Sequence, residues 1–577
     1  MKVLLLHPED DLPRTSGKLW DVVVDLGRAP GGLYEKWRQV AGCEVLSLYD
    51  FAEEIGDLYR IRELLQLGSG QLVDAEGIDW WNVVALELVP DLLRLVLAQR
   101  LSQRLGPCEL ETSRPDPVAS ALAFMVDSPL QFAAGAPRAW RRKVTHYAQL
   151  LTKLDRHQLA QAVEDKLHLN GFGRKFALPR SYSREPVILL PSAYSNASRT
   201  AVELATQLTD RKFLLVCTRT NGNLSRLPPN VAAAPLAMNS AARNNEELAQ
   251  LLDRWQQLRG CLISQTDECA AANAVGVLDK IPVLMRWGIS YRDAWELVFR
   301  INDIAGCLCT DDSNPPTRIP LDLARARGLP AVACHHGALD YFMALKTTPA
   351  EFYIAKSDLE RDYLLRVCRL PEGRIVGGAS VAQESLKRAR QSEPADRPWL
   401  VFFSEPYTTG GWRSDEVYLE LLPYLSRLAE DLGLQLVLKI HPFESVREHR
   451  RRLRRCLPQR GNEIQVIAGP PSAELWQKTR LALTVQSSTA LHCAELGIPV
   501  FLCGWLRDAQ SGYQEQFLRF GVGEVLESVE QIAEIPMRLR EQAEWTSRAR
   551  QIWRPLAAEE LEVLFSGARS TLAASSC

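Results

Sequence analysis

The pattern that decides the fold is clearest in LALTVQSSTALHCAELGIPVFL, residues 481–502. The apolar run 481–485 predicts a buried strand that ends in polar residues. Residues 489–496 have the spacing of an amphipathic helix, and Pro499–Leu502 predicts a second strand. A strand, a helix and a further strand in this order predict neighbouring parallel strands of an α/β sheet.

The same alternation extends outward from this segment in both directions and predicts two doubly wound, Rossmann-like units. Other strands of the unit at 398–577 are predicted at Trp399–Phe403, Leu434–Ile440 and Ile464–Ile467, and its other helices at Asp415–Leu432 and Ser472–Lys478. Strands of the unit at 186–388 are predicted at Val187–Leu190, Phe213–Cys217, Gly260–Ser264, Ile304–Thr310, Ala331–Cys334 and Phe352–Ala355. Its helices are predicted at Arg199–Leu208, Asn245–Leu258, Leu321–Arg327 and Asp358–Cys368.

Residues 1–185 form a third region, predicted to be a helix-rich N-terminal extension of mixed α/β type. Val3–Leu6 predicts a strand, and Asp79–Leu105 an amphipathic helix that Pro90 kinks or divides in two. Residues 139–169 are also helical in pattern. The polar segment Gln391–Pro398 predicts the linker between the two Rossmann-like units, and residues from about 529 onward predict closing helices.

Composition and charge exclude several classes of function. The chain has 577 residues, 46% of them hydrophobic, and 68 Lys plus Arg against 70 Asp plus Glu. A protein that grips nucleic acid along its phosphates has a basic surplus, so no nucleic-acid partner is expected. The one local surplus, Arg447–Arg460, is interpreted as a solvated helix face. A patch that touches anionic lipid or an acidic acceptor is the alternative, and with it peripheral membrane association.

The cysteines and the N-terminus point to a cytoplasmic enzyme. Thirteen cysteines without regular spacing suit reduced thiols, of which Cys217, Cys334 and Cys503 lie in or beside apolar runs. The apolar run after Met1 is too short for a secretory signal. No apolar run reaches the roughly 18 residues that a membrane span needs.

Polar residues at strand ends are the candidate site, because ligands of open α/β sheets bind outside the carboxyl ends of the strands. Gln486, Ser487, Ser488 and Thr489 follow a strand and open a helix, a place where hydroxyls and free N–H groups bind phosphate. A plain helix cap is the alternative. Glu495, near the end of that helix, is a candidate for ribose hydroxyls or a solvated charge.

A second strand end carries Lys439, Ile440, His441 and Pro442. Lys439 lies in an apolar strand, which is costly unless it has a partner. Alternation along the strand puts Lys439 and His441 on the same side. The pair suits the negative charge of a phosphate or a leaving nucleotide.

The unit at 186–388 supplies candidates for the acceptor side. His336, in His335-His336-Gly337, could act as general base. Adjacent histidines on an extended chain point apart, and no third ligand stands at a sensible spacing, so no metal is expected. The other candidates are Arg199 for phosphate or carboxylate, and the carboxylates of Asp311, Asp312 and Glu405, while His7 and Asp127 are further candidates for the base.

Taken in order, His335-His336-Gly337, Lys439-Ile-His441-Pro442 and the segment Ser487–Val500 resemble glycosyltransferases of the GT-B type that build surface or capsular polysaccharide. The set includes bacterial sialyltransferases, capsule Kdo transferases and CDP-glycerol glycerophosphotransferases, and the resemblance covers about residues 300–510. It implies that His441, Pro442, Ser487 and Ser488 bind a nucleotide phosphate, usually of a cytidine nucleotide. The family often has Gln-His-Gly where this chain has His335-His336-Gly337, and the acidic motif of the sialyl enzymes is not evident here.

The resemblance implies two domains that face a cleft and transfer of a sugar or polyol phosphate from a nucleotide-activated donor to a polysaccharide or glycolipid acceptor. His336 and Asp311 would be the catalytic residues, and no cofactor or metal is expected. Enzymes of the non-hydrolysing UDP-N-acetylglucosamine 2-epimerase type share this architecture and are an alternative. A non-catalytic binding protein is a third reading, against which Lys439, His441 and Ser487 argue.

Overall fold

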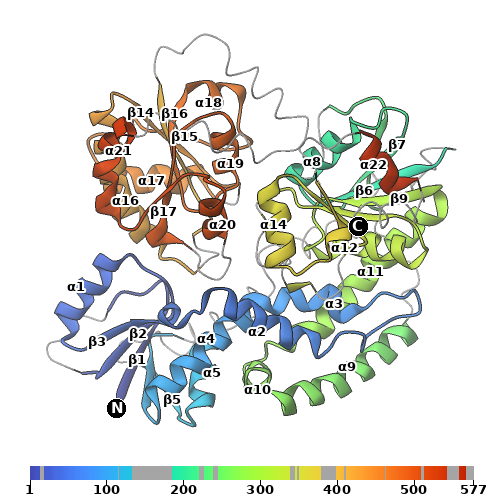
Figure 1. The fold of residues 1–577 in the computed structure, drawn as a ribbon. Helices are drawn as coiled ribbons and strands as arrows, with labels where there is room; N and C mark the ends of the chain where they lie inside the picture. Colours follow the sequence, from blue (N-terminus) through green and yellow to red (C-terminus); the bar gives the residue numbers. More distant parts are fainter. Residues whose placement is uncertain are drawn as a thin grey trace.

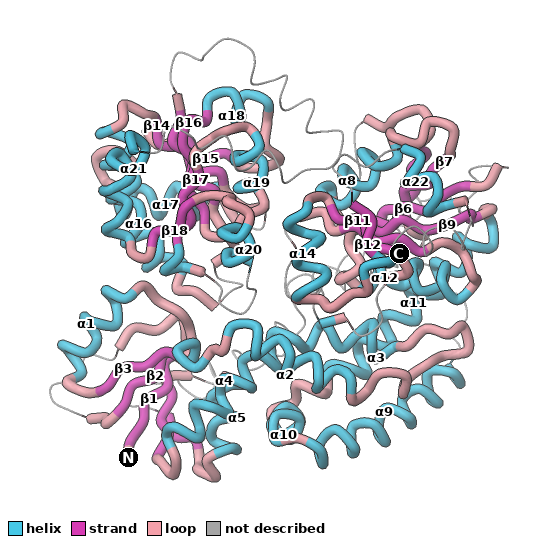
Figure 2. Tube along the Cα trace, in the orientation of Figure 1, coloured by secondary structure: helices cyan, strands magenta, loops and turns pink. Residues whose placement is uncertain are grey.

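The computed structural model has three parallel sheets, shown in Figures 1 and 2. In each sheet the first strand lies between the second and the fourth, which is the doubly wound order. The two Rossmann-like units predicted from the sequence are therefore confirmed, and the N-terminal region holds a further sheet. The structure describes residues 1–12, 19–114, 116–132, 185–219, 226–237, 245–337, 339, 345–346, 350–377, 398–407, 411–442, 444–461, 463–507, 513–541 and 558–566.

The first sheet has the order β3-β2-β1-β4-β5. Of its strands the sequence predicted only β1, because the others have three or four residues each and show too little alternation. The strands are β1 (Lys2–Leu6), β2 (Val22–Asp25), β3 (Glu44–Ser47), β4 (Glu109–Thr112) and β5 (Leu130–Phe132). The helices are α1 (Gly31–Ala41), α2 (Glu54–Gln66), α3 (Trp80–Val84), α4 (Val89–Leu105) and α5 (Pro117–Met125).

The second sheet has the order β12-β11-β10-β9-β6-β7-β8. Its strands are β6 (Val187–Ser192), β7 (Lys212–Cys217), β8 (Val231–Pro235), β9 (Ile304–Cys309), β10 (Ala331–Cys334), β11 (Phe352–Ala355) and β12 (Ile375–Gly377). Its helices are α8 (Ser195–Ala205), α9 (Asn245–Gln265), α10 (Asp267–Ala274), α11 (Lys280–Ile301), α12 (Pro315–Ala326) and α14 (Asp358–Arg366).

The third sheet has the order β15-β14-β13-β16-β17-β18. Its strands are β13 (Trp399–Phe403), β14 (Gln435–Lys439), β15 (Gln465–Ile467), β16 (Thr479–Thr484), β17 (Val500–Cys503) and β18 (Glu524–Leu526). The helices that follow in this part of the chain are α16 (Ser414–Asp431), α17 (Val446–Cys456), α18 (Ala473–Lys478), α19 (Thr489–Glu495), α20 (Tyr513–Arg519), α21 (Ile535–Glu541) and α22 (Ala558–Phe565).

Two expectations are corrected and two fall outside the described residues. The predicted strand Gly260–Ser264 is wrong, since these residues end α9, whose buried Leu251, Trp255, Leu258 and Leu262 repeat at helical spacing. Helix α22, expected with the unit at 398–577, instead packs on the second sheet through Leu561, Leu564 and Phe565. The helical pattern at 139–169 lies outside the described residues, as does the linker apart from Pro398.

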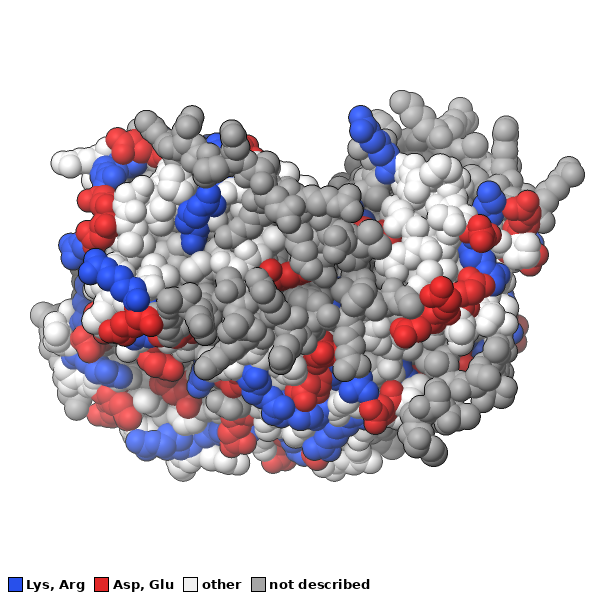
Figure 3. Space-filling view, turned by 45° about the horizontal axis from the view of Figure 1, so that its top comes forward, with Lys and Arg blue, Asp and Glu red and all other residues white. Residues whose placement is uncertain are grey.

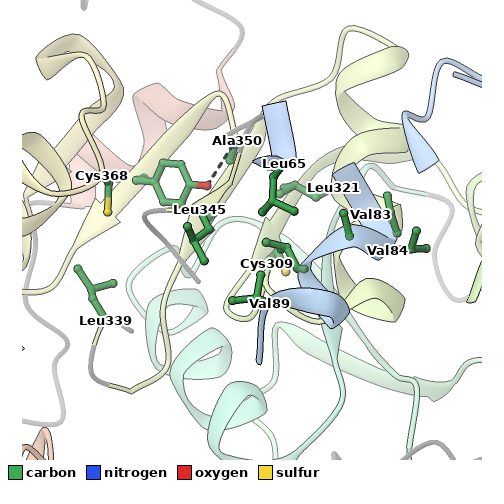
Figure 4. Close-up of a cluster of buried hydrophobic side chains, with 14 of the residues drawn as sticks. Leu65, Val83, Val84, Val89, Cys309, Leu321, Leu339, Leu345, Ala350 and Cys368 are labelled. Atoms are coloured by element: carbon green, nitrogen blue, oxygen red, sulfur yellow. Dashed lines mark hydrogen bonds between the residues drawn. The ribbon is translucent and has the colours of Figure 1, made fainter. Parts of the chain in front are cut away.

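Helices of the N-terminal region share a core with the second sheet. Pro90 stands in the first turn of α4, so the predicted long helix is divided there as the sequence indicated. Figure 4 shows side chains of α2, α3 and α4 beside those of the second sheet, among them Leu65, Val83, Val89, Cys309 and Leu321. Buried Arg292 of α11 donates to Asp74 at 2.8 Å and to Glu247 at 2.7 Å. These ion pairs also connect the N-terminal region with helices of the second unit.

The contact of α3 with α11 gives a first prediction. A Cβ at Gly288 would lie 2.3 Å from Cζ3 of Trp80, whose ring is fully buried and held by Asp74. We expect Gly288→Ala to lower the free energy of unfolding by about 2 kcal/mol, because overpacking of up to about 3 kcal/mol outweighs a gain in helix propensity of about 1 kcal/mol.

Gly260 of α9 is the matched control, since nothing lies within 4 Å of its added Cβ. We expect Gly260→Ala to raise the stability by about 1 kcal/mol. Urea unfolding of the two full-length variants measures both values. Equal effects of the two substitutions would contradict the close contact at Trp80.

A loop of the third unit forms an ion pair and hydrogen bonds with residues at the first sheet. Arg413, just before α16, donates to both carboxylate oxygens of Asp25, at 2.9 and 2.8 Å, and to the carbonyl of His7 at 2.9 Å. The backbone N–H of Arg28 donates to the carbonyl of Gly411 at 2.8 Å. The carboxyl edge of the first sheet is therefore in contact with the segment that follows β13. Among the described residues no helix is both long and apolar enough to cross a membrane.

Candidate functional site

The carboxyl ends of strands in the second and third sheets face each other. Figure 1 shows the two units side by side, and Figure 3 shows the described surface of each unit in a tilted view. His336 of the second unit lowers the pKa of His441 in the third, and Arg199 lowers that of Lys439, so both pairs lie within electrostatic reach. On one flank Gln516 of α20 donates to the Leu359 carbonyl at 3.1 Å and joins the two units.

Lys439 is buried at the end of β14 with little to neutralise it. Its Nζ donates to the carbonyl of Ile440 at 3.0 Å, and no carboxylate of the described residues forms an ion pair with it. Burial, and after it the charge of Arg199, lowers the pKa of Lys439 to about 8, while Glu444 opposes the shift without forming an ion pair. A buried ammonium without an ion pair is costly, which favours a role in binding an anion.

His441 lies beside Lys439 as the alternation of the strand predicted, and a buried network holds its backbone. Its N–H is shared between Ser404 Oγ and Glu444 Oε2, each at 3.1 Å, and the hydroxyl of Ser404 donates to Glu444. Burial and the charges of Lys439 and His336 lower the pKa of His441 to about 4, so the ring is neutral at pH 7 without an anion. Pro442 is exposed at the turn that follows.

Behind this turn lie groups that the sequence analysis missed. Tyr418 of α16 donates to Nε2 of His449 at 2.9 Å and lies 3.4 Å from Glu444 Oε1. Burial raises the pKa of Glu444 and of Tyr418. The signal was present in the sequence, since Glu444 follows His441 by three residues, but its link to Ser404 depends on strands β13 and β14 being neighbours.

The hydroxyl segment follows β16, on the other side of β13. The hydroxyl of Thr489 donates to that of Ser487 at 3.0 Å, and Ser488 precedes α19 without a side-chain cap bond. The hydroxyl of Ser487 also accepts from the N–H of Thr489 at 3.4 Å, so one hydroxyl of the segment caps the helix while that of Ser488 does not. Because β13 separates β14 from β16, the segment lies about 10 Å from Lys439 and His441. Glu495 stands at the opposite end of α19, and the structure does not bring it to the strand ends.

Glu405 fills the space between the two predicted motifs. It follows β13 at the switch point of the third sheet, and the N–H of Gln486 points to its Oε1 at 3.4 Å. Burial raises the pKa of Glu405 to about 8, with Glu444 adding to the shift. Its carboxyl is therefore mostly protonated at pH 7 and can donate a hydrogen bond to a ligand there. The sequence analysis named Glu405 among the candidate carboxylates.

The second sheet contributes His336, Tyr194 and Asp311 at its own switch point. Nδ1 of His336 lies 3.1 Å from the carbonyl of Thr310, which only accepts, so Nδ1 carries a proton and Nε2 is the basic nitrogen. Burial lowers the pKa of His336, while Asp311 opposes that shift. The phenol of Tyr194 donates to Asp311 and its ring meets that of His336 edge to face at 5.3 Å.

One geometric expectation for this segment is wrong. The rings of His335 and His336 do not point apart but stack at 4.9 Å, because the chain bends after β10. Lys356 holds this bend by donating to the carbonyls of His335 and Gly337, the latter at 2.8 Å. Among the described residues no group of three or more His, Cys, Asp or Glu could hold a metal ion.

Of the other candidate residues, one lies near the strand ends where the second and third sheets meet, and the others do not. Arg199 lies in α8, bonded to Asn196 and within reach of Lys439. Asp312 is buried in an ion pair with Lys346 and accepts from Tyr353 at 2.8 Å, so it is structural. His7 and Asp127 belong to the N-terminal region, and Asp127 precedes β5, at the opposite edge of the first sheet from the strand carboxyl ends.

Together these side chains form a mostly basic junction, with two protonatable carboxyls on the third-sheet side. Arg199 and Lys439 supply positive charge, while His336 and His441 are neutral rings that can gain it near an anion. The hydroxyls of Ser487 and Thr489 add donors on the far side of β13. This arrangement suits an anion with two phosphate groups, close to a histidine that can accept a proton.

Comparisons with known proteins find resemblances to solved structures only. No protein-family model matches the chain, and no curated protein matches it. Staphylococcus aureus MnaA in complex with UDP is 12% identical, covers 66% of this chain and 95% of its own, and has a TM-score of 0.41. UDP-GlcNAc 2-epimerase from Neisseria meningitidis bound to UDP-GlcNAc is also 12% identical, covers 66% and 99%, and has a TM-score of 0.40. The wall teichoic acid polymerase TagF soaked with CDPG is 12% identical, covers 74% and 99%, and has a TM-score of 0.39.

Proposed function

We propose that this chain is a glycosyltransferase-like enzyme that transfers a sugar or polyol phosphate from a nucleotide-activated donor to an acceptor hydroxyl. The observation that carries the proposal is the junction of four basic groups from two sheets, Arg199, His336, Lys439 and His441, around strand ends. Lys439 carries most weight, because its burial without a carboxylate lowers stability unless an anion binds it. The resemblance of the strand-end motifs to transferases that make surface polysaccharide points to the same chemistry.

In the proposed reaction the donor diphosphate lies on the third sheet. Lys439 and His441 bind one phosphate, and Ser487, Ser488 and Thr489 bind the other, with β13 between them. The acceptor hydroxyl loses its proton to Nε2 of His336, whose imidazolium Asp311 stabilises through charge. The acceptor oxygen then forms a bond to the anomeric carbon of a sugar, or to the phosphorus of a polyol phosphate. The bond between that atom and the leaving phosphate oxygen breaks, and its electron pair leaves with the nucleotide. Lys439 and protonated Glu405 stabilise that leaving charge.

The carboxyls of Glu405 and Glu444 favour a second candidate, an enzyme of the UDP-N-acetylglucosamine 2-epimerase type. Such chemistry removes a proton from carbon and returns it, and Glu405 with its pKa of about 8 could exchange protons near neutral pH. A diphosphate would bind in the same place for either reaction. The two candidates differ in whether an acceptor is required.

Isothermal titration with CMP, CDP, UDP and GDP tests the shared premise. We expect one nucleoside diphosphate to bind more tightly than its monophosphate, because the site spans two phosphates. Absence of binding by all four would overturn the proposal. Turnover of UDP-N-acetylglucosamine without an acceptor would favour the epimerase, whereas dependence on an acceptor would favour transfer.

The pH dependence of binding gives a further prediction. Ionised Glu405 repels a phosphate, so affinity for the diphosphate should fall as pH rises through about 8, by up to about tenfold per pH unit. Loss of the Lys439 proton over the same range acts in the same direction. We expect Glu405→Gln to give a shallower fall, because the amide keeps a hydrogen-bond donor and does not ionise.

Lys439→Arg separates the two contributions, since arginine keeps its charge throughout this range. The fall that remains in Lys439→Arg belongs to Glu405, and the double variant should bind with little pH dependence. Titrations of each variant from about pH 7 to about pH 9 measure these slopes. Identical slopes for the unsubstituted chain and Glu405→Gln would rule out this role of Glu405.

A further inference from the structure

Seven arginines lie between positions 447 and 460, six of them in helix α17 and Arg460 beyond its end, and the structure sorts them into two sets. Four of them are engaged with the protein. Arg452 and Arg455 pair with Asp415 at 2.8 and 3.1 Å, Arg460 pairs with Glu430, and Arg450 donates to the Ile464 carbonyl at 3.1 Å.

The second set is Arg447, Arg451 and Arg454, which we name the arginine row. All three are exposed, and no carboxylate of the described residues pairs with them. The one bond they make through a side chain is from Nε of Arg454 to the carbonyl of Arg450 at 3.3 Å. Their spacing of four and three residues puts them on one helix face, extending about 10 Å along the axis.

The arginine row borders a hollow rather than a flat surface. The three arginines line it with Ser445 and Glu448, and its volume is about 480 Å³. Glu448 lowers the net charge of the lining to two positive charges. The opposite face of α17 is fixed in the protein, since His449 and Leu453 are buried.

The position of the hollow relates it to the junction. The helix begins at Val446, five residues after His441, so Arg447 in its first turn is the end nearest the proposed donor site. The arginine row therefore begins six residues after His441 in the sequence and extends along α17 away from the end of β14.

We propose that the arginine row binds a linear polyanionic chain, carrying phosphate or carboxylate groups along its length, as the acceptor of the transferase. The identification of this polyanion as the acceptor rests on the proposed function, whereas its binding to the arginine row does not. Three cations in line beside a hollow match a chain with repeated negative charges. Among the described residues of α17, Val446, at 39% exposed, is the one exposed large apolar side chain, which argues against insertion of this helix into a bilayer.

The test uses the full-length chain with inorganic polyphosphate longer than the row, with tripolyphosphate, and with vesicles containing phosphatidylglycerol. The variant is Arg447→Gln/Arg451→Gln/Arg454→Gln. Its matched control removes three exposed arginines from elsewhere, as Arg286→Gln/Arg427→Gln/Arg540→Gln. Binding is measured by titration at about 0.05 and about 0.2 M salt.

We expect the long polyphosphate to bind more tightly than tripolyphosphate, and the row variant to lose at least about tenfold in affinity. The salt dependence of its binding should shrink by about 0.7 in slope per arginine. The control should change affinity less than about twofold, because isolated exposed charges add little. Equal loss in both variants, or row-dependent binding of the vesicles in place of polyphosphate, would overturn the inference.

Nucleotide titration of the row variant keeps this test separate from that of the proposed function. Unchanged nucleotide affinity with weakened polyphosphate binding supports a distinct site. Polyphosphate binding through the row in a chain that binds no nucleotide would refute the transferase proposal and leave the polyanion site standing. Nucleotide binding without row-dependent polyphosphate binding would do the reverse.

Discussion

Arg413→Ala is expected to destabilise the contact between the first and third units by about 3–5 kcal/mol, the loss typical of breaking a buried ion pair from one side. The Asp25 carboxylate is fully buried. Without the guanidinium it would retain the N–H of Gly27 at 3.0 Å and the hydroxyl of Tyr34 at 3.1 Å, which do not neutralise it. The carbonyl of Asp10 would lose the donor that Arg413 supplies, and the carbonyl of His7 would keep only the N–H of Asp10 at 2.9 Å.

Arg413→Lys should be nearly as damaging as Arg413→Ala. The guanidinium donates to two carboxylate oxygens and two carbonyls at once and lies 4.8 Å from the Trp37 ring centre. An ammonium cannot reproduce that planar set of donors. The double variant Asp25→Asn/Arg413→Gln should recover part of the loss, because it removes both buried charges together.

Hydrogen exchange of the β1 and β2 amides measures the change where it acts, since a chain with several units need not unfold in one step. The same exchange in the second sheet serves as an internal control and should not change. A loss below about 1 kcal/mol at β1 and β2 would show that the ion pair is no stronger than an exposed one.

The sequence predicted the fold best where strands are long and buried on both faces. Trp399–Phe403 and Leu481–Val485, which overlaps β16, are apolar runs of this kind, and the alternation with helices predicted their parallel pairing. The first sheet was missed beyond β1 because its strands are short. The strand predicted at Gly260–Ser264 was wrong because a short apolar run does not distinguish a strand from the last turns of a helix.

In the site, too, the sequence predicted what depends on residues of one strand and missed what depends on contacts between separate strands. Lys439 and His441 were found because two residues of one strand share a side. The link between Ser404 and Glu444, and the position of Glu405 between the two predicted motifs, depend on strand order across the sheet. His336 was found as a strand end, but the facing of His336 and His441 depends on how two units sit together. No pattern within either segment contains that information.

Lys439→Met is expected to change stability and binding in opposite directions. The Lys439 ammonium is buried with a carbonyl as its hydrogen-bond partner, so removing it also removes a desolvation cost. We expect the free energy of unfolding at pH 7 to rise, or at least not to fall. The apolar methionine side chain has a similar length and keeps the packing.

The pH dependence of stability should identify this cost. The pKa of Lys439 is about 8 in the folded chain and about 10.5 unfolded, so the unfolded state binds more protons between these values. The penalty is therefore complete below pH 8 and disappears as pH rises toward 10.5, which makes the unsubstituted chain gain stability over that range. Lys439→Met should lack this gain. Lys478→Met, at a partly exposed lysine that pairs with Glu474, should keep it.

Affinity for the nucleoside diphosphate should fall in Lys439→Met by about tenfold to a hundredfold, since one hydrogen bond to a charged group is worth about 1.5–3 kcal/mol. Lys478→Met should bind as the unsubstituted chain does. A residue kept only for packing would give equal affinities in both variants, and a residue kept for stability would give a lower unfolding free energy in Lys439→Met. The combination of stronger folding with weaker binding is what a buried cation reserved for an anionic ligand requires, because the ligand supplies the charge that the protein leaves out.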